Sequence, residues 1–293
     1  MIRGRNDTIV KAATSLAVAL VVLWTLAPFY WMLISSISER RDLLSFPPQW
    51  LPSNPTLERY KLMVGAAGGA NVDSEILKPA LLFRRALINS AIAAGMTTLL
   101  SLVVGTLAGY AYSRLRFAFR RNLLTLTVVV HMLPPIATLI PLYMTLRYVG
   151  LLNELAGLIL VYSALAITYV VWVMNGYFKT IPRELEESAR IDGCTRFGAL
   201  WRVVLPLTGP GLVATGLLVF ITTWNEFLYA LVLMNFPDGK TVPVVVAEFT
   251  TQFGVDYGMM MTGGVLTSLP PVVLALIFQR HLVRGLTAGA VKG

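Results

Sequence analysis

The sequence predicts an all-α membrane protein with six transmembrane helices. Charged residues make up 13% of the chain and hydrophobic residues 56%, whereas a soluble domain carries about 25% charged residues. Six apolar runs each approach the roughly 20 residues that a spanning helix needs. The predicted spans are Ala12–Ile34, Ala86–Tyr112, Leu123–Leu146, Leu155–Tyr177, Thr208–Leu233 and Met259–Phe278.

The distribution of Lys and Arg predicts that both termini are cytoplasmic. Six spans place the two termini on one side. Fifteen Lys and Arg residues fall on that side and nine on the other. The positive-inside rule assigns the richer side to the cytoplasm. The net charge of +9 is therefore interpreted as a consequence of topology, not as a nucleic-acid surface.

Composition divides the chain into three parts. Residues 1–82 are predicted to form the first helix and a proline-rich extracytoplasmic loop. Residues 83–279 are predicted to form a five-helix transmembrane domain, interrupted by a polar loop at about residues 180–206. Residues 280–293 form a short, mildly basic cytoplasmic tail in this interpretation.

The polar loop, Thr180 to Pro206, is predicted to be a helix–glycine–helix unit. Thr180 is a candidate N-cap of the first helix, and Gly193 is placed to end that helix in a left-handed conformation. Thr195 is a candidate N-cap of a second helix, which Pro206 is expected to end. Acids near the start of the first helix suit the helix dipole, and they are Glu184, Glu186 and Glu187. One face of the second helix is predicted to carry Phe197, Leu200, Trp201 and Val204.

Several residues of this loop are too apolar for a free aqueous connection. They are Leu185, Ala189, Ile191, Phe197 and Trp201. Either the membrane bundle or a partner protein must cover them. The alternative is a solvated connection whose acids and bases pair along the helix. The pattern favours docking of a partner.

The sequence offers little for catalysis or metal binding. It has two histidines, and its single cysteine, Cys194, excludes an intrachain disulfide and a multi-cysteine metal site. No metalloprotease helix motif or serine nucleophile elbow occurs. We expect no catalytic site, no metal and no cofactor in this chain. If ATP drives the protein, another chain binds it.

Three polar residues within the spans are candidates for a transport pathway: Asn225, Glu226 and His131. A carboxylate in hydrocarbon costs a few kcal/mol, so Glu226 should face protein or water. Asn225 and Glu226 line a polar passage in one interpretation and hold neighbouring helices together in the other. For His131, before Pro134 and Pro135, a buried hydrogen-bonded position is the favoured alternative to a broken helix beside a pathway. Gly105 and Gly109 are spaced GxxxG, which predicts a close helix contact.

The loop residues Glu187-Ser188-Ala189, Gly193 and Val203-Val204-Leu205-Pro206 resemble a known motif. This is the "EAA" loop of binding-protein-dependent ABC importer permeases: Glu-Ala-Ala, three residues, Gly, nine residues, Ile-x-Leu-Pro. Ser188 and Val203 are conservative departures from it. The Arg114–Arg121 loop, Trp224-Asn225-Glu226-Phe227 and the tail resemble the carbohydrate branch, in particular the second permease of a maltose-type system.

The resemblance implies a type I ABC importer fold and a set of functional residues. The loop helix would seat in a cleft of an ATPase through Glu187, Ser188, Ala189, Asp192, Gly193, Leu205 and Pro206. Tail residues near the ATPase would include Arg284, Gly285, Gly289 and Lys292. The implied partners are a sister permease, two ATPase subunits that bind ATP and Mg, and an extracytoplasmic solute-binding protein.

The expected function is a sugar or oligosaccharide permease in a bacterial or archaeal plasma membrane. Glycerol-phosphate-type or polyol solutes are the alternative cargo. Two more distant alternatives are an intramembrane enzyme that uses His131 or Glu226 and a secondary transporter. The latter calls for inverted repeats, and none is evident in the sequence.

Overall fold

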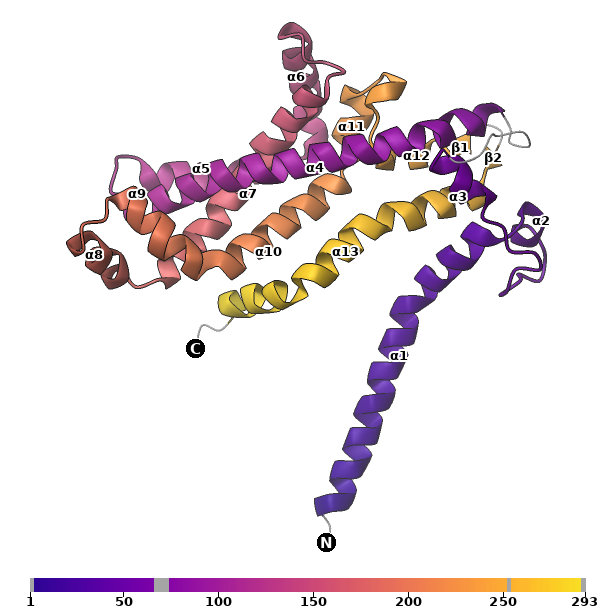
Figure 1. The fold of residues 1–293 in the computed structure, drawn as a ribbon, viewed down its shortest axis with the longest axis horizontal. Coiled ribbons are helices and arrows are strands. Elements are labelled where there is room, and N and C mark those ends of the chain that lie inside the picture. The colour runs from indigo at the N-terminus through magenta and orange to yellow at the C-terminus, as the bar shows by residue number, and fades with distance from the viewer. Residues whose placement is uncertain (1–2, 66–73, 252–253, 291–293) are drawn as a thin grey trace. The chain divides into compact units, whose positions relative to one another are not determined.

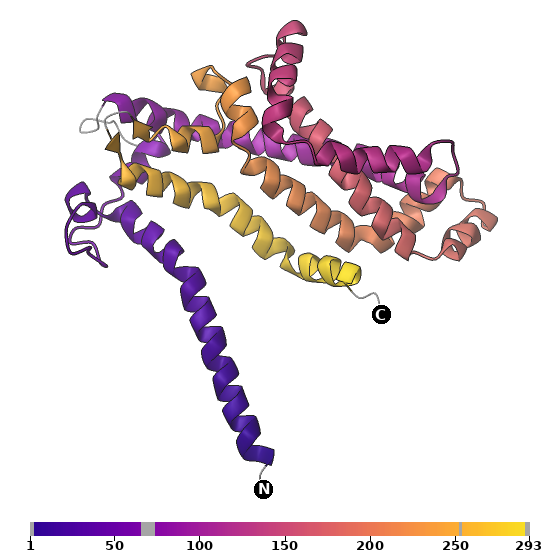
Figure 2. The same ribbon diagram turned by 180° about the vertical axis from the view of Figure 1, so that it is seen from behind.

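The structure, a computed structural model, describes residues 3–65, 74–251 and 254–290 (Figures 1 and 2). Within these residues, five helices are long and apolar enough to cross a membrane, and there are six spans if one pair of bent helices is counted as a single broken span. The described part of the chain is nearly all helical. Its only strands are the two-residue β1 (Thr250–Thr251) and β2 (Gly254–Val255), which pair antiparallel. The predicted all-α membrane fold is confirmed, with five spans, or six if the bent pair is one span.

The chain divides into two compact units, and each is described separately. One unit comprises residues 1–84 and 245–268, and the other comprises residues 85–244 and 269–293. Three helices contribute to both units: α4 (Ser74–Arg114), α12 (Val242–Ala247) and α13 (Tyr257–Ala290). The remaining helices of the first unit are α1 (Arg3–Ile37), α2 (Arg40–Leu43) and α3 (Glu58–Met63).

The second unit holds the polar loop and most of the apolar core. Its helices are α5 (Arg120–His131), α6 (Pro135–Tyr148), α7 (Leu155–Thr180), α8 (Arg183–Ile191), α9 (Arg196–Ala199), the π-helical turn η1 (Leu200–Val204), α10 (Leu205–Trp224), α11 (Leu228–Leu233) and the 3-10 turn η2 (Pro237–Gly239). Helix α7 packs against both α5 and α10. Helices α8 and α9 lie at the end of α7 opposite to α6 (Figure 1).

The third predicted span, Leu123–Leu146, is not one straight helix. Helix α5 ends at His131, α6 begins at Pro135, and the two helices are bent by 99°. Pro134 is extended, with ψ 132°, and Pro135 has no N–H to continue a helix and disfavours a helical residue before it. The paired prolines therefore break the apolar run.

The fifth predicted span, Thr208–Leu233, ends earlier than expected. Helix α10 ends at Trp224, and α11 begins at Leu228. The break falls on Asn225, Glu226 and Phe227. A hydropathy window averages over a break of three residues, so the sequence predicted one continuous helix here.

Two buried clusters form the core of the second unit. One lies between α4, α7, η1 and α10 and contains Tyr110, Val170, Met174, Phe178, Ile181, Leu200, Val204 and Val219. The other lies between α4, α6, α7, α11 and α12 and includes Leu146, Leu158, Tyr162, Tyr229 and Leu233. The first cluster touches the start of the polar loop, so this loop is continuous with the packed core.

The predicted GxxxG contact is confirmed. A Cβ built at Gly105 would lie 2.6 Å from Val170 Cβ, and one at Gly109 would lie 3.1 Å from Met174 Cβ. Both neighbours belong to α7. The two glycines let α4 approach α7 more closely than any side chain would permit.

Candidate functional site

The first helix of the polar loop ends as predicted. Gly193 has φ +92°, a conformation that glycine adopts at little cost. Its N–H bonds to Arg190 O at 3.2 Å, and the N–H of Cys194 bonds to Ala189 O at 2.9 Å. These two bonds form a Schellman motif, which satisfies carbonyl groups at the end of α8 and turns the chain sharply.

The predicted start of this helix is wrong. Thr180 is the last residue of α7, and its hydroxyl donates to Tyr177 O at 2.8 Å. The N-cap of α8 is Pro182, which has no side-chain donor or acceptor. Helix α7 continues three residues beyond Tyr177, its predicted end. It therefore includes Thr180, which was predicted to cap the next helix.

The second helix of the loop starts where predicted but does not end at Pro206. Thr195 Oγ1 accepts from the Gly198 N–H at 3.1 Å, as expected of an N-cap. Helix α9 then continues through the π-turn η1 into α10, and Leu205 N–H bonds to Leu200 O five residues back. Pro206 lies in the first turn of α10. The wider π-turn accommodates a proline that would clash inside a regular α-helix.

A buried ion pair attaches α8 to α4. The Glu186 carboxylate pairs with Arg114 Nε at 3.1 Å, and both side chains are nearly buried. The same carboxylate accepts the hydroxyl of Tyr110. Arg114 Nη2 also donates to Ile181 O at 2.9 Å. Two residues of α4 therefore hold the polar loop at both the end of α7 and the first turn of α8.

The opposite face of α8 is exposed. Glu187, Ser188, Asp192 and Gly193 are all exposed, whereas Ala189 is buried. Of the remaining motif residues, Leu205 is half-buried and Pro206 is exposed. Most of the predicted motif residues therefore lie at the surface of one loop, whereas the side chain of Ala189 is buried.

Large apolar side chains surround this exposed face. Ile191 is 87% exposed, and Leu185 is also exposed. Phe197 and Trp201 are exposed and stack on each other, with ring centroids 6.2 Å apart. The four residues predicted to share one face of the second helix therefore do not share it. Leu200 and Val204 are buried in the core, whereas Phe197 and Trp201 are exposed. The exposed aromatic pair belongs to a surface that needs a cover.

A small polar pocket of about 90 Å³ lies between α8 and the neighbouring arginines. It is lined by Arg114, Leu115, Arg183, Glu186, Glu187, Arg190 and Arg196. Glu186 lies on its inner side, paired with Arg114, whereas Glu187 is exposed. Two adjacent glutamates thus have different environments, and only Glu187 is available to a second protein.

The predicted tail continues helix α13. Residues Arg284, Gly285 and Gly289 lie within this helix, which extends to Ala290. Lys292 lies outside the described residues. The division at residue 280 stays a prediction.

Glu226 occupies the break between α10 and α11. Its carboxylate accepts from the N–H groups of Tyr229 and Ala230 at 3.0 and 3.2 Å, so it caps the N-terminus of α11. It also accepts the hydroxyl of Tyr162, on α7, at 2.5 Å. Glu226 thus bonds a neighbouring helix, as one of the two interpretations expected.

Glu226 and His131 also share a pocket of about 340 Å³. The pocket is lined by His131, Tyr162, Leu165, Ala166, Tyr169, Leu218, Val219, Thr222, Thr223 and Glu226. His131 is exposed, and its ring meets Tyr169 edge-on at 6.2 Å. The prediction of a buried histidine is therefore wrong, because no residue of α5 is buried. The helix breaks after His131, as the other interpretation expected. Asn225 instead caps the end of α10, and its amide donates to Ile221 O at 2.9 Å.

Residues 79–288 match the family described as binding-protein-dependent transport system inner membrane component. The chain belongs to this family.

Relatives are similar to this permease over almost its whole length. The trehalose transport system permease protein SugB of Mycobacterium tuberculosis is 37% identical over 276 residues, which cover 94% of this chain and 95% of that protein. The sulfoquinovosyl glycerol transport system permease protein SmoH of Agrobacterium fabrum is 34% identical over 283 residues, which cover 97% of this chain and 94% of that protein.

The fold also matches a solved importer. The crystal structure of a bacterial ABC transporter involved in the import of the acidic polysaccharide alginate contains a chain that matches with a TM-score of 0.76. The match covers 94% of this permease and 97% of that chain at 21% sequence identity, so it establishes the fold. The permease has the type I ABC importer fold and is a multi-pass protein of a prokaryotic cell membrane.

The permease is a non-catalytic membrane subunit, since ATP hydrolysis in ABC transporters of this family belongs to a separate partner. Among the described residues, no cluster of three His, Cys, Asp or Glu side chains is arranged to hold a metal.

Sequence reasoning missed the anchor formed by Glu186, Arg114 and Tyr110. A signal for it was present. Glu186 and Ala189 are three residues apart and share one helix face, whereas Glu187 and Ile191 share another. An apolar Ala189 directed inward would have placed Glu186 inward too, although not its partners on α4.

Proposed function

We propose that this permease imports a sugar or oligosaccharide as one half of a permease heterodimer. Relatives named for trehalose and for sulfoquinovosyl glycerol support a carbohydrate-containing cargo. The complete importer would contain a sister permease, two ATPase subunits that bind ATP and Mg, and an extracytoplasmic solute-binding protein. The Lys and Arg distribution supports cytoplasmic termini and a cytoplasmic polar loop.

The observation that supports the coupling role is the exposed surface of α8, α9 and η1. Glu187, Asp192 and the apolar side chains of Ile191, Phe197 and Trp201 lie exposed on one loop. That loop is fastened to the core by Glu186 and ended by the Gly193 motif. A short, stiff helix with an apolar, charged surface suits a cleft in an ATPase. Movement of that ATPase would then reach α4 through the Glu186–Arg114 pair.

We further propose that the pocket shared by His131 and Glu226 is part of the solute path. Its lining combines one carboxylate, one imidazole and two phenol rings. Such groups suit hydroxyl-rich solutes, because carboxylates accept hydrogen bonds and aromatic faces cover the apolar faces of sugar rings. Tail residues Arg284, Gly285, Gly289 and Lys292 are proposed to lie towards the ATPase pair.

Substitutions in the loop test the coupling role in the assembled transporter. We expect Glu187→Lys and Gly193→Asp to leave the permease in the membrane, with uptake of labelled trehalose or maltose reduced at least tenfold and ATP hydrolysis no longer linked to uptake. A matched control is Glu154→Lys, the same charge change at an exposed position at the other end of α7. Uptake at the wild-type rate in both loop variants would overturn the coupling role.

Purification of the tagged permease tests the partners. An ATPase, a second permease and a solute-binding protein should be recovered with it, and a panel of sugars should stimulate ATP hydrolysis by the complex. If only glycerol phosphodiesters or polyols stimulate it, the proposed cargo is wrong while the coupling role stands.

A further inference from the structure

The segment between α2 and α3 exposes large apolar side chains outside any predicted span. Phe46 is 97% exposed, and Trp50 and Leu51 are 68% and 72% exposed. Leu44, at the start of the segment, is exposed as well. An apolar group of this kind on a polar loop marks a surface that meets a protein or a membrane. We call residues 44–51 the outer hairpin loop.

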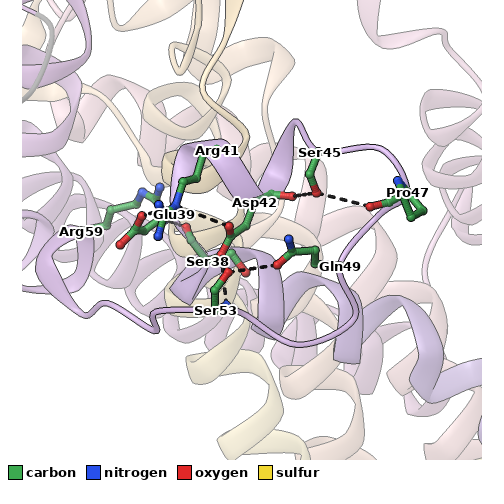
Figure 3. A network of polar contacts seen from close by, with 9 residues as sticks. All are labelled: Ser38, Glu39, Arg41, Asp42, Ser45, Pro47, Gln49, Ser53 and Arg59. Atoms are coloured by element: carbon green, nitrogen blue, oxygen red, sulfur yellow. Dashed lines mark hydrogen bonds and ion pairs between the residues drawn. The ribbon is translucent and has the colours of Figure 1, made fainter.

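A polar network holds the outer hairpin loop in a defined shape (Figure 3). Asp42 is buried, and its carboxylate accepts from both the N–H and the hydroxyl of Ser53, at 3.1 and 2.9 Å. Ser45 donates to Asp42 O at 2.8 Å, and the Ser53 hydroxyl lies 3.1 Å from Gln49 Oε1. These bonds join the two ends of the loop.

The same unit is tied to the outer end of α1. Arg59 Nη1 donates to Ser38 O at 2.6 Å and to Ser36 O at 3.3 Å. The N–H of Thr56 donates to Ile37 O at 2.8 Å. These bonds satisfy carbonyls at the end of α1 that would otherwise lack a partner in the helix. The loop therefore moves with the end of this spanning helix.

The outer hairpin loop folds back along α1 instead of leading away from it. The Tyr30 hydroxyl donates to Trp50 O at 2.8 Å, and the rings of Trp31 and Trp50 meet edge-on at 5.5 Å. Tyr30 lies seven residues before the end of α1, which is roughly 10 Å along the helix. Trp50 is thus carried back towards the membrane by about that distance.

The position of Trp31 sets the depth of the loop. A helix needs roughly 20 residues to cross the hydrocarbon core. The predicted span begins at Ala12, so a stretch of this length ends at Trp31. Trp and Tyr rings favour the boundary between this core and the headgroups. Trp31 and Trp50 are in contact, so both lie at the outer boundary.

We propose that the outer hairpin loop is inserted into the outer lipid–water interface, where Phe46, Trp50 and Leu51 contact lipid and anchor the end of α1. The loop is bonded to α1, a helix that crosses the membrane, and this favours lipid over a protein as its contact. A solute-binding protein approaches from water, whereas the loop lies about two helical turns inside the end of α1.

Site-specific fluorescence in lipid nanodiscs tests this insertion. The full permease, in its assembled transporter, would carry Cys194→Ser together with Phe46→Cys, labelled with an environment-sensitive dye. Phe46 makes no buried contact, so the fold should be retained. Glu58→Cys is the matched control, because Glu58 is exposed on α3 in the same outer segment. Leu51→Cys provides a second test position.

We expect lipids brominated near the headgroup to quench the dye at positions 46 and 51 at least twofold more than at position 58. Aqueous iodide should show the opposite order. Equal quenching by iodide at positions 46 and 58 would place the loop in water and overturn the proposal. Shielding of position 46 from both quenchers would mean that a protein covers it, and would overturn the proposal equally.

Discussion

At the scale of single residues, the neighbouring glutamates of α8 have separate tasks. Glu186 is paired with Arg114 inside the protein, and Glu187 is exposed. A carboxylate next to a buried guanidinium is costly to remove, because the remaining charge has no partner. Glu186 is therefore interpreted as the residue that positions α8, while Glu187 remains exposed for the contact with an ATPase that we propose.

Removing the Glu186 charge should destabilise the permease. We expect Glu186→Gln to lower the free energy of unfolding by about 3 kcal/mol, because Arg114 is left buried and unpaired. Adding Arg114→Gln should cost less than the sum of the two single changes. Denaturant unfolding in detergent micelles measures all three variants. Glu184→Gln, at an exposed position in the same helix, should change stability by less than about 0.5 kcal/mol. Additive losses in the double variant would contradict the pairing.

At the scale of elements, glycines on α4 determine how closely it packs against α7. The Cβ built at Gly105 meets Val170 Cβ, an atom held rigidly by its own helix. A Cβ built at Gly95 meets nothing within 4 Å apart from its chain neighbours and the backbone of its own helix. A glycine is therefore required for close helix packing at position 105 but not at position 95.

Alanine substitutions should separate these two glycines. Gly105→Ala is expected to destabilise the permease by about 1–3 kcal/mol, because α4 and α7 must move apart. Gly95→Ala should leave stability unchanged or raise it by up to about 1 kcal/mol, since alanine favours the helix and meets nothing. Thermal unfolding of the purified variants provides the measurement. An equal loss in both would show that helix packing does not depend on Gly105.

The broken helices show what hydropathy does and does not predict at this scale. The caps at Gly193 and Thr195 were predicted correctly, because each depends on bonds within a few residues. The continuation of the helix through Pro206 was not, because the π-turn η1 forms where Leu200 and Val204 are packed in the core. The ends of α5 and α10 likewise fall inside apolar runs.

At the scale of the whole molecule, the asymmetry of positive charge predicts a cytoplasmic polar loop. The single cysteine, Cys194, follows Gly193 in the polar loop and is half-buried. If the loop is cytoplasmic, this thiol reports orientation directly.

Labelling of Cys194 tests the orientation. A membrane-impermeant maleimide should modify the permease in inside-out vesicles and leave it unmodified in right-side-out vesicles. Docked ATPase should slow the reaction, since Cys194 adjoins the exposed face of α8. A Cys194→Ser variant controls for labelling elsewhere. Modification in right-side-out vesicles would reverse the proposed topology.

The sequence alone determined the class of this protein, four of its helical spans, the position of the polar loop, the motif from Glu187 to Pro206 and the caps at Gly193 and Thr195. These features depend on composition and on interactions between near neighbours, which a sequence displays directly. Only the tertiary structure decided that Glu186 turns inward to Arg114, that His131 and Glu226 share one pocket, and that Trp50 returns to Trp31. These arrangements bring together residues between 19 and 95 positions apart, and packing of the folded chain, not local preference, selects them.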